Sequence, residues 1–386
     1  MLQTTPVSAF ALSEEQQAIR EAARRFTAEE ITPHAARWDA EHVFPLETLR
    51  RAAALGFGAI YVGEAYGGAG LGRIEAALVM EEMAYGCPST SAFVSIHNMA
   101  AWMIDRFGNA ELKARFLPSL VSMERIASYC LTEPGAGSDA ASLRTRAERD
   151  GDHYIVTGSK AFISGAGASD LYLTMVRTGG PGAGGISCLV IEKDMPGVSF
   201  GAPERKLGWH SQPTAQVHFD GVRVPVANRV GDEGQGFRIA MAGLDGGRLN
   251  IAACSLGGAQ RALDEAIAYT RERRQFGQAI ADFQATRFTL ADVATELEAA
   301  RALLWTAAAR VEAEAPDRTM FAAMAKRFAT DVGSAVVDRA LQLFGGYGYL
   351  MDYPLERLWR DLRVHRILEG TNEIMRVIIA RELLGR

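Results

Sequence analysis

The order of hydrophobic patterns along the 386-residue chain constrains its fold more than any other feature. Apolar residues recur at helical spacing in the first third, β-rich runs separated by glycine turns follow after Arg125, and long alanine- and leucine-rich helical patterns return from about Gly236. No repeat of fixed period and no low-complexity linker interrupts this order. The sequence therefore predicts an α+β multidomain protein, with helical, β and helical domains over residues 1–126, 127–234 and 235–386.

Local signals place helices in the first domain. Ser13 followed by Gln16 has the sequence of a capping box. Gly56, Gly86 and Gly108 stand where C-terminal helix caps are expected. The apolar spacing predicts further helices over residues 46–55, 74–85, 92–107 and 110–121.

The other two domains have different hydrophobic patterns. The middle domain is predicted to be antiparallel, with strands over residues 154–157, 171–176, 186–191 and 216–219. The last domain is predicted to be a helical bundle, with helices over residues 284–311 and 319–343. Gly180 to Gly185 matches the GxGxxG pattern of dinucleotide sites, but a predicted strand follows it where such a site requires a helix. We therefore expect a glycine-rich hairpin loop at this position.

Composition and charge exclude several classes of protein. A net charge of −5 gives no reason to expect a nucleic-acid partner. No apolar run approaches the ~20 residues needed to cross a bilayer, which predicts a soluble chain without a membrane partner. Met1 to Ala11 has no basic region followed by a long apolar core, so no secretory signal is expected. Four cysteines without metal-ligand or CxxC spacing predict reduced, buried thiols and no metal site, namely Cys87, Cys130, Cys188 and Cys254.

Glu369 is the leading candidate for a catalytic base. It lies beside Gly370, just before a predicted helix that Thr371 can cap. This arrangement gives a short, aimed carboxyl group. On this segment alone, a solvated loop acid is the more common role for such a residue, and both alternatives stay open.

The segment from Tyr129 to Asp139 leads from strand-forming residues into a loop of hydroxyls, glycines and a proline, which suits a polar heterocycle or a phosphate. At this segment the chain resembles the acyl-CoA dehydrogenase family, whose flavin-binding signature it matches almost residue for residue. The resemblance continues at residues 158–164, 230–237, 271–277, 342–348 and 366–376. It spans essentially the whole chain and implies the family's fold: an N-terminal helical domain, a middle antiparallel β-barrel or sandwich domain, and a C-terminal four-helix bundle.

The resemblance implies FAD as the cofactor. Around the isoalloxazine ring, it assigns Tyr129, Leu131, Thr132 and Ser138 to one side, and Phe162 and Ser164 to the other. Phe162 departs from the tryptophan of many members, although a phenyl ring can still stack on a flavin. For the ribityl, pyrophosphate and adenosine parts, several of them held across a subunit boundary, it assigns Arg273, Phe276, Phe283, Gln284, Gln342, Gly345, Gly346, Thr371 and Glu373.

The resemblance also implies an acyl-CoA substrate. Asp245 and Arg248 match positions that contact the CoA moiety, although an Asp and an Arg at this spacing would most often be a surface ion pair. The other positions assigned to the substrate are Ser138, Phe237, Leu244, Leu368, Gly370 and Arg381.

The implied reaction removes hydrogen across Cα and Cβ of a thioester. Glu369 would take the α-proton, and the β-hydride would go to flavin N5, because no amino-acid side chain accepts a hydride. A free glutamate has a pKa near ~4.3. Burial beside an acyl chain and a flavin is expected to raise it toward the working pH.

Leu368 suggests which acyl group is used. Many straight-chain members have an aromatic residue there, so a smaller wall leaves room for a branch near Cα. The resemblance is closest to members that oxidise isobutyryl-CoA to methacrylyl-CoA in valine breakdown, with 2-methylbutyryl-CoA and butyryl-CoA as alternatives. The predicted helix with Phe93 and Met99 would line the acyl pocket or be a plain core helix, and His97 on it is expected to be a packed histidine.

The family implies electron-transfer flavoprotein as the electron acceptor, a homotetramer, and a bacterial cytoplasm or mitochondrial matrix as the compartment. Two other classes of function stay open at this point. An oxidase-like enzyme would use the same base and flavin but reoxidise on O₂. A non-catalytic acyl-CoA-binding protein would keep the ligand site without the reaction.

Overall fold

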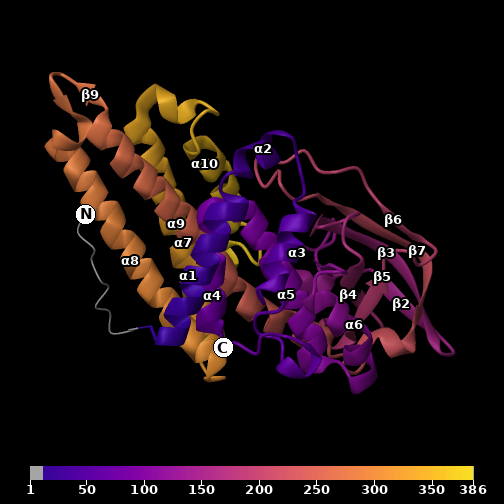
Figure 1. Cartoon of the computed structure of the whole chain (residues 1–386). Coiled ribbons are helices and arrows are strands. Elements are labelled where there is room, and N and C mark those ends of the chain that lie inside the picture. The colour runs from indigo at the N-terminus through magenta and orange to yellow at the C-terminus, as the bar shows by residue number, and fades with distance from the viewer. Residues whose placement is uncertain (1–11, 386) are drawn as a thin grey trace.

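The computed structural model describes residues 12–385 of the chain. The expectation that Met1 to Ala11 is not a secretory signal therefore falls outside the described residues. Helices of the first part lie in the centre of the molecule, the β-sheet forms one end, and the C-terminal helices form the other (Figure 1). This order confirms the predicted succession of helical, β and helical parts.

Short helices build the first part. Its elements are α1 (Glu14–Phe26), the π-helical η1 (Thr27–Ile31), α2 (Ala35–Ala40), α3 (Leu46–Ala54), η2 (Glu64–Tyr66), α4 (Arg73–Gly86), α5 (Pro88–Phe107) and α6 (Ala110–Val121). The predicted capping box is confirmed, because Gln16 N–H donates to Ser13 Oγ over 3.1 Å and Ser13 N–H donates to Gln16 Oε1 over 3.0 Å.

The predicted cap at Gly86 is wrong. Gly86 is the last residue of α4, and Cys87 is its C-cap. A Cβ at Gly86 would lie 2.7 Å from Cγ2 of Thr27 and 2.9 Å from Cγ2 of Ile31. The glycine is therefore explained by the close packing of α4 against η1 and not by helix termination.

One sheet forms the middle part. Its strands are β1 (Ala127–Cys130), β2 (Arg146–Asp150), β3 (His153–Ser164), β4 (Leu171–Arg177), β5 (Ile186–Glu192), β6 (Val198–Phe200), β7 (Thr214–Pro225) and β8 (Arg229–Val230). Their order is β6-β7-β3-β2-β4-β5-β8, and β1 pairs with β4. The loop with the GxGxxG pattern joins the antiparallel neighbours β4 and β5, which confirms the predicted hairpin.

The prediction of a wholly antiparallel sheet is wrong at two contacts of β4. Strand β1 pairs with it in parallel, from Ala127 opposite Leu171 to Cys130 opposite Thr174, and β2 meets it in parallel at one residue pair. The β2–β3 hairpin lies between β1 and β4 in the chain. That long connection brings β4 back in the direction of β1, as a parallel pair requires.

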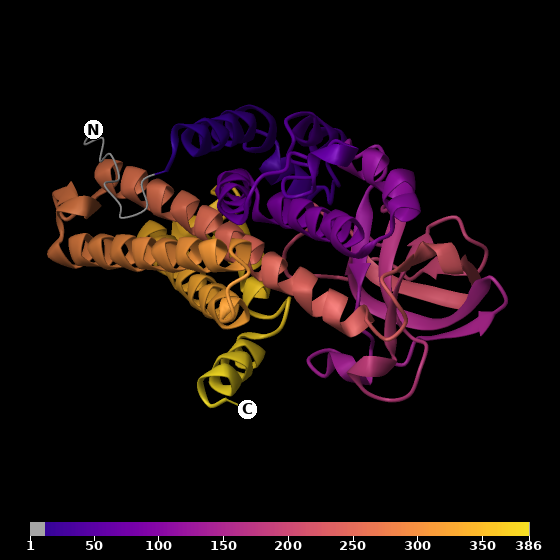
Figure 2. The same cartoon turned by 90° about the horizontal axis from the view of Figure 1, so that it is seen from below.

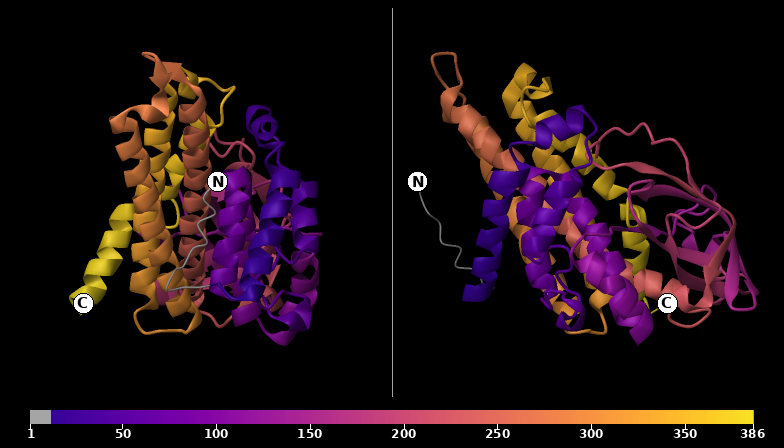
Figure 3. Two further views of the ribbon diagram at one scale, coloured as in Figure 1. Left: turned by 60° about the vertical axis from the view of Figure 1, so that its left-hand side comes forward. Right: turned by 45° about the vertical axis from the view of Figure 1, so that its right-hand side comes forward.

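Long helices build the last part, and they confirm the predicted bundle. The elements are α7 (Gly236–Glu272), a hairpin of β9 (Arg274–Gln275) and β10 (Gln278–Ala279), η6 (Ile280–Asp282), α8 (Gln284–Glu312), α9 (Arg318–Phe344), η7 (Gly345–Tyr349), α10 (Leu355–Arg363), η8 (Val364–Arg366) and α11 (Asn372–Leu383). Helices α7, α8 and α9 lie side by side, and α11 stands against α9 with its far end away from the bundle (Figure 3).

Helix α7 connects the two ends of the molecule. Its 37 residues run from the edge of the sheet, past α4 and α5, to the β9–β10 hairpin (Figure 2). Glycines let its neighbours approach closely: a Cβ at Gly257 would lie 2.0 Å from the Glu81 carbonyl oxygen of α4. Within residues 12–385, the structure contains no helix that is both long and apolar enough to cross a membrane.

Candidate active site

Glu369 lies in the short segment between η8 and α11. Its φ of 54° and the φ of 91° at Gly370 are both positive. A left-handed conformation is uncommon for a residue with a side chain, and it persists where the surroundings over-determine it. Thr371 caps α11 as predicted, because its Oγ1 accepts a hydrogen bond from Ile374 N–H over 3.3 Å.

The carboxyl group of Glu369 lies against the backbone of α7. A Cβ at Gly247 would be 2.5 Å from Oε2 of Glu369, so only a glycine leaves the carboxyl group in this place. Oε2 is buried and has no hydrogen-bond partner within residues 12–385, although the residue as a whole is partly exposed. Burial raises the pKa of Glu369 to about 7, against the opposing effect of the Arg248 and Lys326 charges. The group is thus set to exchange a proton near neutral pH.

Arg248 and Asp245 of α7 form a buried pair beside this carboxyl group, not a surface ion pair. Arg248 Nη1 donates to Asp245 Oδ1 over 2.9 Å, and Asp245 Oδ2 accepts from Thr319 Oγ1 over 2.7 Å. Arg248 Nε also donates to the Glu369 carbonyl over 3.3 Å. The backbone N–H of Glu369 makes no hydrogen bond in the described part of the chain, which leaves it available to an acceptor on a ligand.

Lys326 of α9 completes this cluster, and sequence reasoning missed it. Its Nζ donates to the Gly370 carbonyl over 2.8 Å and to Asn372 Oδ1 over 2.9 Å, and the side chain is fully buried. Burial lowers the pKa of Lys326 to about 8, while the negative charge of Glu369 acts in the opposite direction. The signal was a lysine on the alanine-rich face of a predicted helix, with Ala322, Ala323 and Ala329 as its neighbours.

The residues predicted to face the flavin ring lie where β1 ends and where β3 bulges. Ala161 N–H donates to the Thr132 carbonyl over 2.9 Å, which ties the loop after β1 to β3. A register shift between Lys160 and Ile163 turns Phe162 outward, with a φ of 57° and 68% of the side chain exposed. An exposed phenyl face beside a fixed loop suits a flat heterocycle, so these residues fit a flavin.

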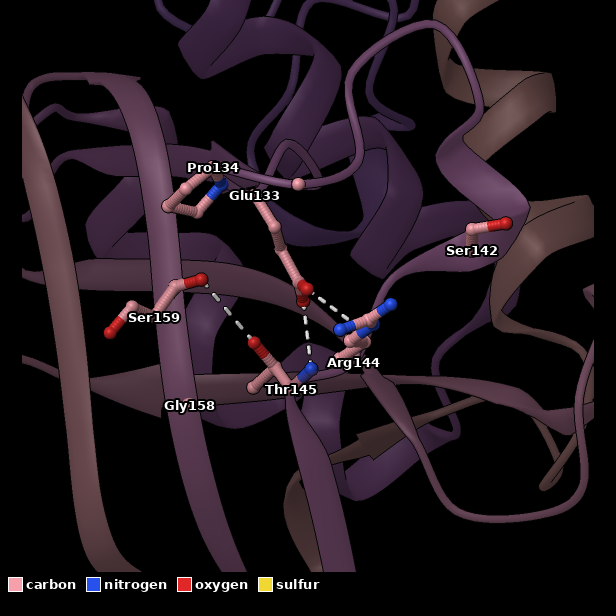
Figure 4. Close-up of a pocket in the computed structure, with 8 residues that line it drawn as sticks. Glu133, Pro134, Ser142, Arg144, Thr145, Gly158 and Ser159 are labelled. Carbon is pink, nitrogen blue, oxygen red and sulfur yellow. Dashed lines mark hydrogen bonds between the residues drawn. The ribbon is translucent and has the colours of Figure 1, made fainter.

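A buried ion pair, also missed in the sequence, supports that loop. Lys160 Nζ donates to Glu133 Oε1 over 2.8 Å and to the Leu131 carbonyl over 3.1 Å. The Glu133 carboxylate accepts the backbone N–H groups of Arg144 at 2.6 Å and Thr145 at 2.8 Å (Figure 4). Glu133 lines a cavity of ≈ 320 Å³ that none of the residues around Glu369 lines, together with Pro134, Gly135, Ser142, Arg144, Thr145, Gly158 and Ser159.

A second group of predicted cofactor residues lies at the other end of the bundle. Arg273 comes 25 residues after Arg248 along α7, a distance of about 37 Å. Phe276 at the hairpin tip is 94% exposed, and the Arg273 guanidinium stacks over the Tyr347 ring. The structure therefore does not bring these residues to Glu369 within one chain. They are Arg273, Phe276, Phe283, Gln284, Gln342, Gly345 and Gly346.

The remaining predicted residues divide into two sets. Leu244 is buried and Leu368 packs against the main core, both close in sequence to the cluster around Glu369. Phe237 lies in the first turn of α7, eight residues or about 12 Å before Asp245. Ser138, Glu373 and Arg381 are exposed. The hydroxyl group of Tyr129 is buried and has no hydrogen-bond partner among the described residues.

His97 and the cysteines have structural positions. His97 accepts Ala127 N–H at Nδ1 over 3.1 Å and pairs with the Leu120 carbonyl at Nε2 over 2.9 Å, which joins α6 to β1. Burial lowers the pKa of His97 to about 4, so the ring is neutral, as expected for a packed histidine. The cysteines are free and buried, as predicted: Cys87, Cys130, Cys188 and Cys254.

Three family models match nearly all of the chain in succession. They are described as the N-terminal domain of acyl-CoA dehydrogenase over residues 13–124, the middle domain over 128–222, and the C-terminal domain over 234–384.

Similar proteins cover the same length. Two relatives are each named "Isobutyryl-CoA dehydrogenase, mitochondrial". The one from Bos taurus is 55% identical over 97% of this chain and 90% of its own, and the one from Dictyostelium discoideum is 56% identical over 98% and 91%. The solved structure of butyryl-CoA dehydrogenase from Megasphaera elsdenii has a TM-score of 0.95 and 37% identity, over 98% of this chain and 100% of that one.

Proposed function

The chain belongs to the acyl-CoA dehydrogenase family and is a flavin-dependent oxidoreductase, and from that premise we propose that it oxidises isobutyryl-CoA to methacrylyl-CoA with Glu369 as the base. One observation carries the role of Glu369: a buried, unpaired carboxyl oxygen whose group has a pKa raised to about 7. A structural carboxylate would be paired, whereas a base needs an oxygen free to take a proton.

The residues around Glu369 support the α-proton transfer. The proton moves from Cα of the thioester to Oε2, and charge builds up on the thioester oxygen. The free N–H of Glu369 is a donor for that oxygen, because it makes no hydrogen bond in the part of the chain that the structure describes. Arg248 holds the Glu369 carbonyl and so anchors the backbone on the C-terminal side of Glu369.

FAD is the form of flavin in this proposal. When bound, it supplies the acceptor for the β-hydride. Leu131, Thr132, Ser138, Phe162 and Ser164 would hold the ring end within one chain, with Tyr129 behind it. Thr371 and Glu373 lie at the start of α11, two and four residues after Glu369.

The hairpin residues require a second subunit in this proposal. They lie about 37 Å from Arg248 along α7 and cannot reach the flavin of their own chain. Phe276 at the hairpin tip lies edge-on to the Phe283 ring, with 6.3 Å between the ring centroids, yet the residue is 94% exposed and leaves a large apolar surface uncovered. A homotetramer in which hairpins complete neighbouring FAD sites accounts for both observations.

The acyl-CoA would run along the start of α7. Asp245 and Arg248 would contact the CoA moiety, with Ser138, Phe237 and Arg381 as further contacts. Leu368, next to the base, would leave space for the methyl branch. The proposed electron acceptor is electron-transfer flavoprotein, and the compartment is a bacterial cytoplasm or a mitochondrial matrix, which suits four free, buried cysteines.

Anaerobic bleaching of the flavin tests the proposal. Purified protein, reconstituted with FAD, is mixed with isobutyryl-, 2-methylbutyryl-, butyryl- and octanoyl-CoA, and the loss of the oxidised flavin band is followed. Isobutyryl-CoA should bleach fastest at limiting concentration. A preference for octanoyl-CoA would refute the short branched substrate, and a protein that cannot take up FAD would support the non-catalytic alternative. Rapid peroxide formation in air would support the oxidase-like one.

A further inference from the structure

Two buried cations from different helices hold the two carbonyl groups of the segment that carries Glu369. Arg248 of α7 donates to the carbonyl of Glu369 over 3.3 Å, and Lys326 of α9 donates to the carbonyl of Gly370 over 2.8 Å. Glu369 and Gly370 both have a positive φ, a conformation that is uncommon for Glu369 because it carries a side chain. Such a backbone is retained only where its surroundings fix it.

Lys326 also connects this segment to the start of α11. Its second bond, 2.9 Å to Asn372 Oδ1, attaches it to the first residue of α11. Asn372 Nδ2 in turn donates to Thr330 Oγ1 and Asp331 Oδ1, each over 2.9 Å. Three residues of α9, including Lys326, therefore bind the first residue of α11. Helices α7 and α9 therefore hold the carbonyl groups of Glu369 and Gly370, and α9 also holds the side chain of Asn372.

We infer that Lys326 is a positioning residue for the α-proton transfer: it fixes the backbone on which Glu369 stands and faces the Glu369 carboxyl group with its charge. This inference rests on the proposed function, because it concerns the base of that reaction. Lys326 acts through Glu369 and the Gly370 carbonyl and has no contact with substrate in this assignment.

The charges around the two groups determine the sign of the effect. Glu369 faces Arg248 from α7 and Lys326 from α9, and its charge also acts on three neutral groups, Tyr61, Tyr129 of β1 and Cys254 of α7. Lys326 faces Glu369, Arg248, Asp331 of its own helix and Glu373 of α11, and His365 of η8 is a neutral neighbour whose pKa burial lowers to about 3. A positive Lys326 favours the ionised form of Glu369. Its removal therefore leaves Glu369 protonated up to a higher pH.

The experiment compares Lys326→Met with Lys113→Met. Lys113 lies on α6, 25% exposed, with Asp105 at 3.7 Å, and its loss removes the same charge far from the cluster. The rate of anaerobic flavin reduction by isobutyryl-CoA is measured from pH 5.5 to 9. For Lys326→Met, the acid limb of the pH profile, where the rate rises as Glu369 ionises, should move up by about one pH unit, with a rate at pH 7 that is about fivefold lower. Lys113→Met should follow the wild type.

Two further measurements separate this role from a structural one. Infrared difference spectra, with Glu369→Gln as the reference, follow the carboxyl band of Glu369 in the protein without substrate. The pH at which this band titrates should shift in Lys326→Met in the same direction as the acid limb of the rate profile. Thermal unfolding and FAD content report structural damage alone. If Lys326→Met does not fold, Lys326→Gln is used in its place. Lys326→Gln retains a donor for the Gly370 carbonyl but has no charge, so the acid limb of its rate profile should still move to higher pH.

The outcomes are distinct. An unchanged limb and an unchanged carboxyl titration in a folded Lys326 variant would overturn the inference, even if the variant were less stable. Glu369→Gln, measured in the same series, tests the proposed function. Near-normal reduction by Glu369→Gln would refute Glu369 as the base, whereas a slow Glu369→Gln with an unmoved Lys326 limb would refute only the role of Lys326.

Discussion

A Cβ on Gly247 would lie 2.5 Å from Oε2 of Glu369. The two residues are 122 positions apart in sequence, yet one has to be glycine for the other to keep its place. The atom in the way is the far end of a flexible side chain and not backbone. A substitution at Gly247 should therefore move the carboxyl group and leave the fold intact.

Gly247→Ala should separate stability from activity. Alanine in place of a mid-helix glycine favours the helix by up to ~1 kcal/mol, so the unfolding temperature should be unchanged or higher. The displaced carboxyl group should lower the rate of flavin reduction at least about tenfold, because the proton transfer depends on geometry. Stopped-flow reduction with isobutyryl-CoA and differential scanning calorimetry measure the two effects. A stable Gly247→Ala variant that reduces the flavin as fast as the wild type would contradict this prediction, because the carboxyl group could then work from another position.

Glu369→Gln should keep FAD and lose turnover. The amide has nearly the shape of the carboxyl group but cannot take a proton at neutral pH. The reduction rate should fall by about 10² to 10⁴, the usual contribution of a general base. Bound FAD, measured from the visible spectrum after gel filtration, should match the wild type. Turnover close to that of the wild type would rule out this assignment.

The pKa of about 7 for Glu369 predicts how rate and stability depend on pH. The base must be ionised, so kcat/KM should rise through pH 7 and level off above about pH 8. Stability should change in the opposite sense. The folded-state pKa lies above the unfolded one, so this group's contribution is fully present below about pH 4.5 and is lost as pH rises through 7.

Glu369→Gln provides the control for that stability effect. The stability of Glu369→Gln relative to the wild type, measured without ligands as the difference in the free energy of unfolding in urea titrations, should be greater at pH 8 than at pH 5. An equal difference at both pH values would contradict the raised pKa.

Lys160→Met should disturb the loop that carries Leu131 and Thr132. The substitution leaves the Glu133 carboxylate, 7% exposed, without its 2.8 Å partner. Breaking a buried ion pair in this way typically costs about 3 to 5 kcal/mol. FAD affinity should fall with it, because Lys160 also holds the Leu131 carbonyl. Guanidinium unfolding and FAD titration of the apoprotein are the measurements, with Lys113→Met as the charge-matched control.

Phe276→Ala tests whether a neighbouring hairpin completes the FAD site. A side chain that is 94% exposed contributes little to the stability of its own subunit, so the free energy of unfolding should change by less than about 0.5 kcal/mol. FAD content or the mass of the assembly should nevertheless fall. Phe288→Ala on α8, where the side chain is 60% exposed, is the matched control. Loss of neither FAD nor assembly in Phe276→Ala would argue against a shared site.

Much of this fold was predictable because its local signals agree with its tertiary contacts. The capping box at Ser13, the glycine hairpin after β4 and the cap at Thr371 each depend on residues a few positions apart. Gly86 misled the prediction because its reason is a contact with η1, which no local pattern contains. The parallel pairing of β1 with β4 was missed for the same reason.

The candidate site likewise contains residues that the sequence predicted and residues that it did not. Glu369 stands in a motif that carries the family resemblance, the resemblance also assigns Asp245 and Arg248, and the structure brings the three residues together. Lys326 lies 44 residues before its Gly370 partner, and Lys160 lies 27 residues after Glu133. Their importance comes from burial and from bonds to carbonyl groups, which a sequence pattern does not encode. The domain limits at 126/127 and 234/235 stay predictions.

Helix α7 limits how this protein can be divided. Its first turns carry residues that we propose for the substrate, its Gly247 leaves room for the Glu369 carboxyl group, and its last turn leads into the hairpin that we propose for a neighbouring subunit. A chimera that exchanges the β domain with a relative must therefore keep the length and the residue register of α7, since one inserted residue would turn every later side chain by about 100° around the helix axis. Recombination points are better sought in the loops before Gly236 than anywhere along α7.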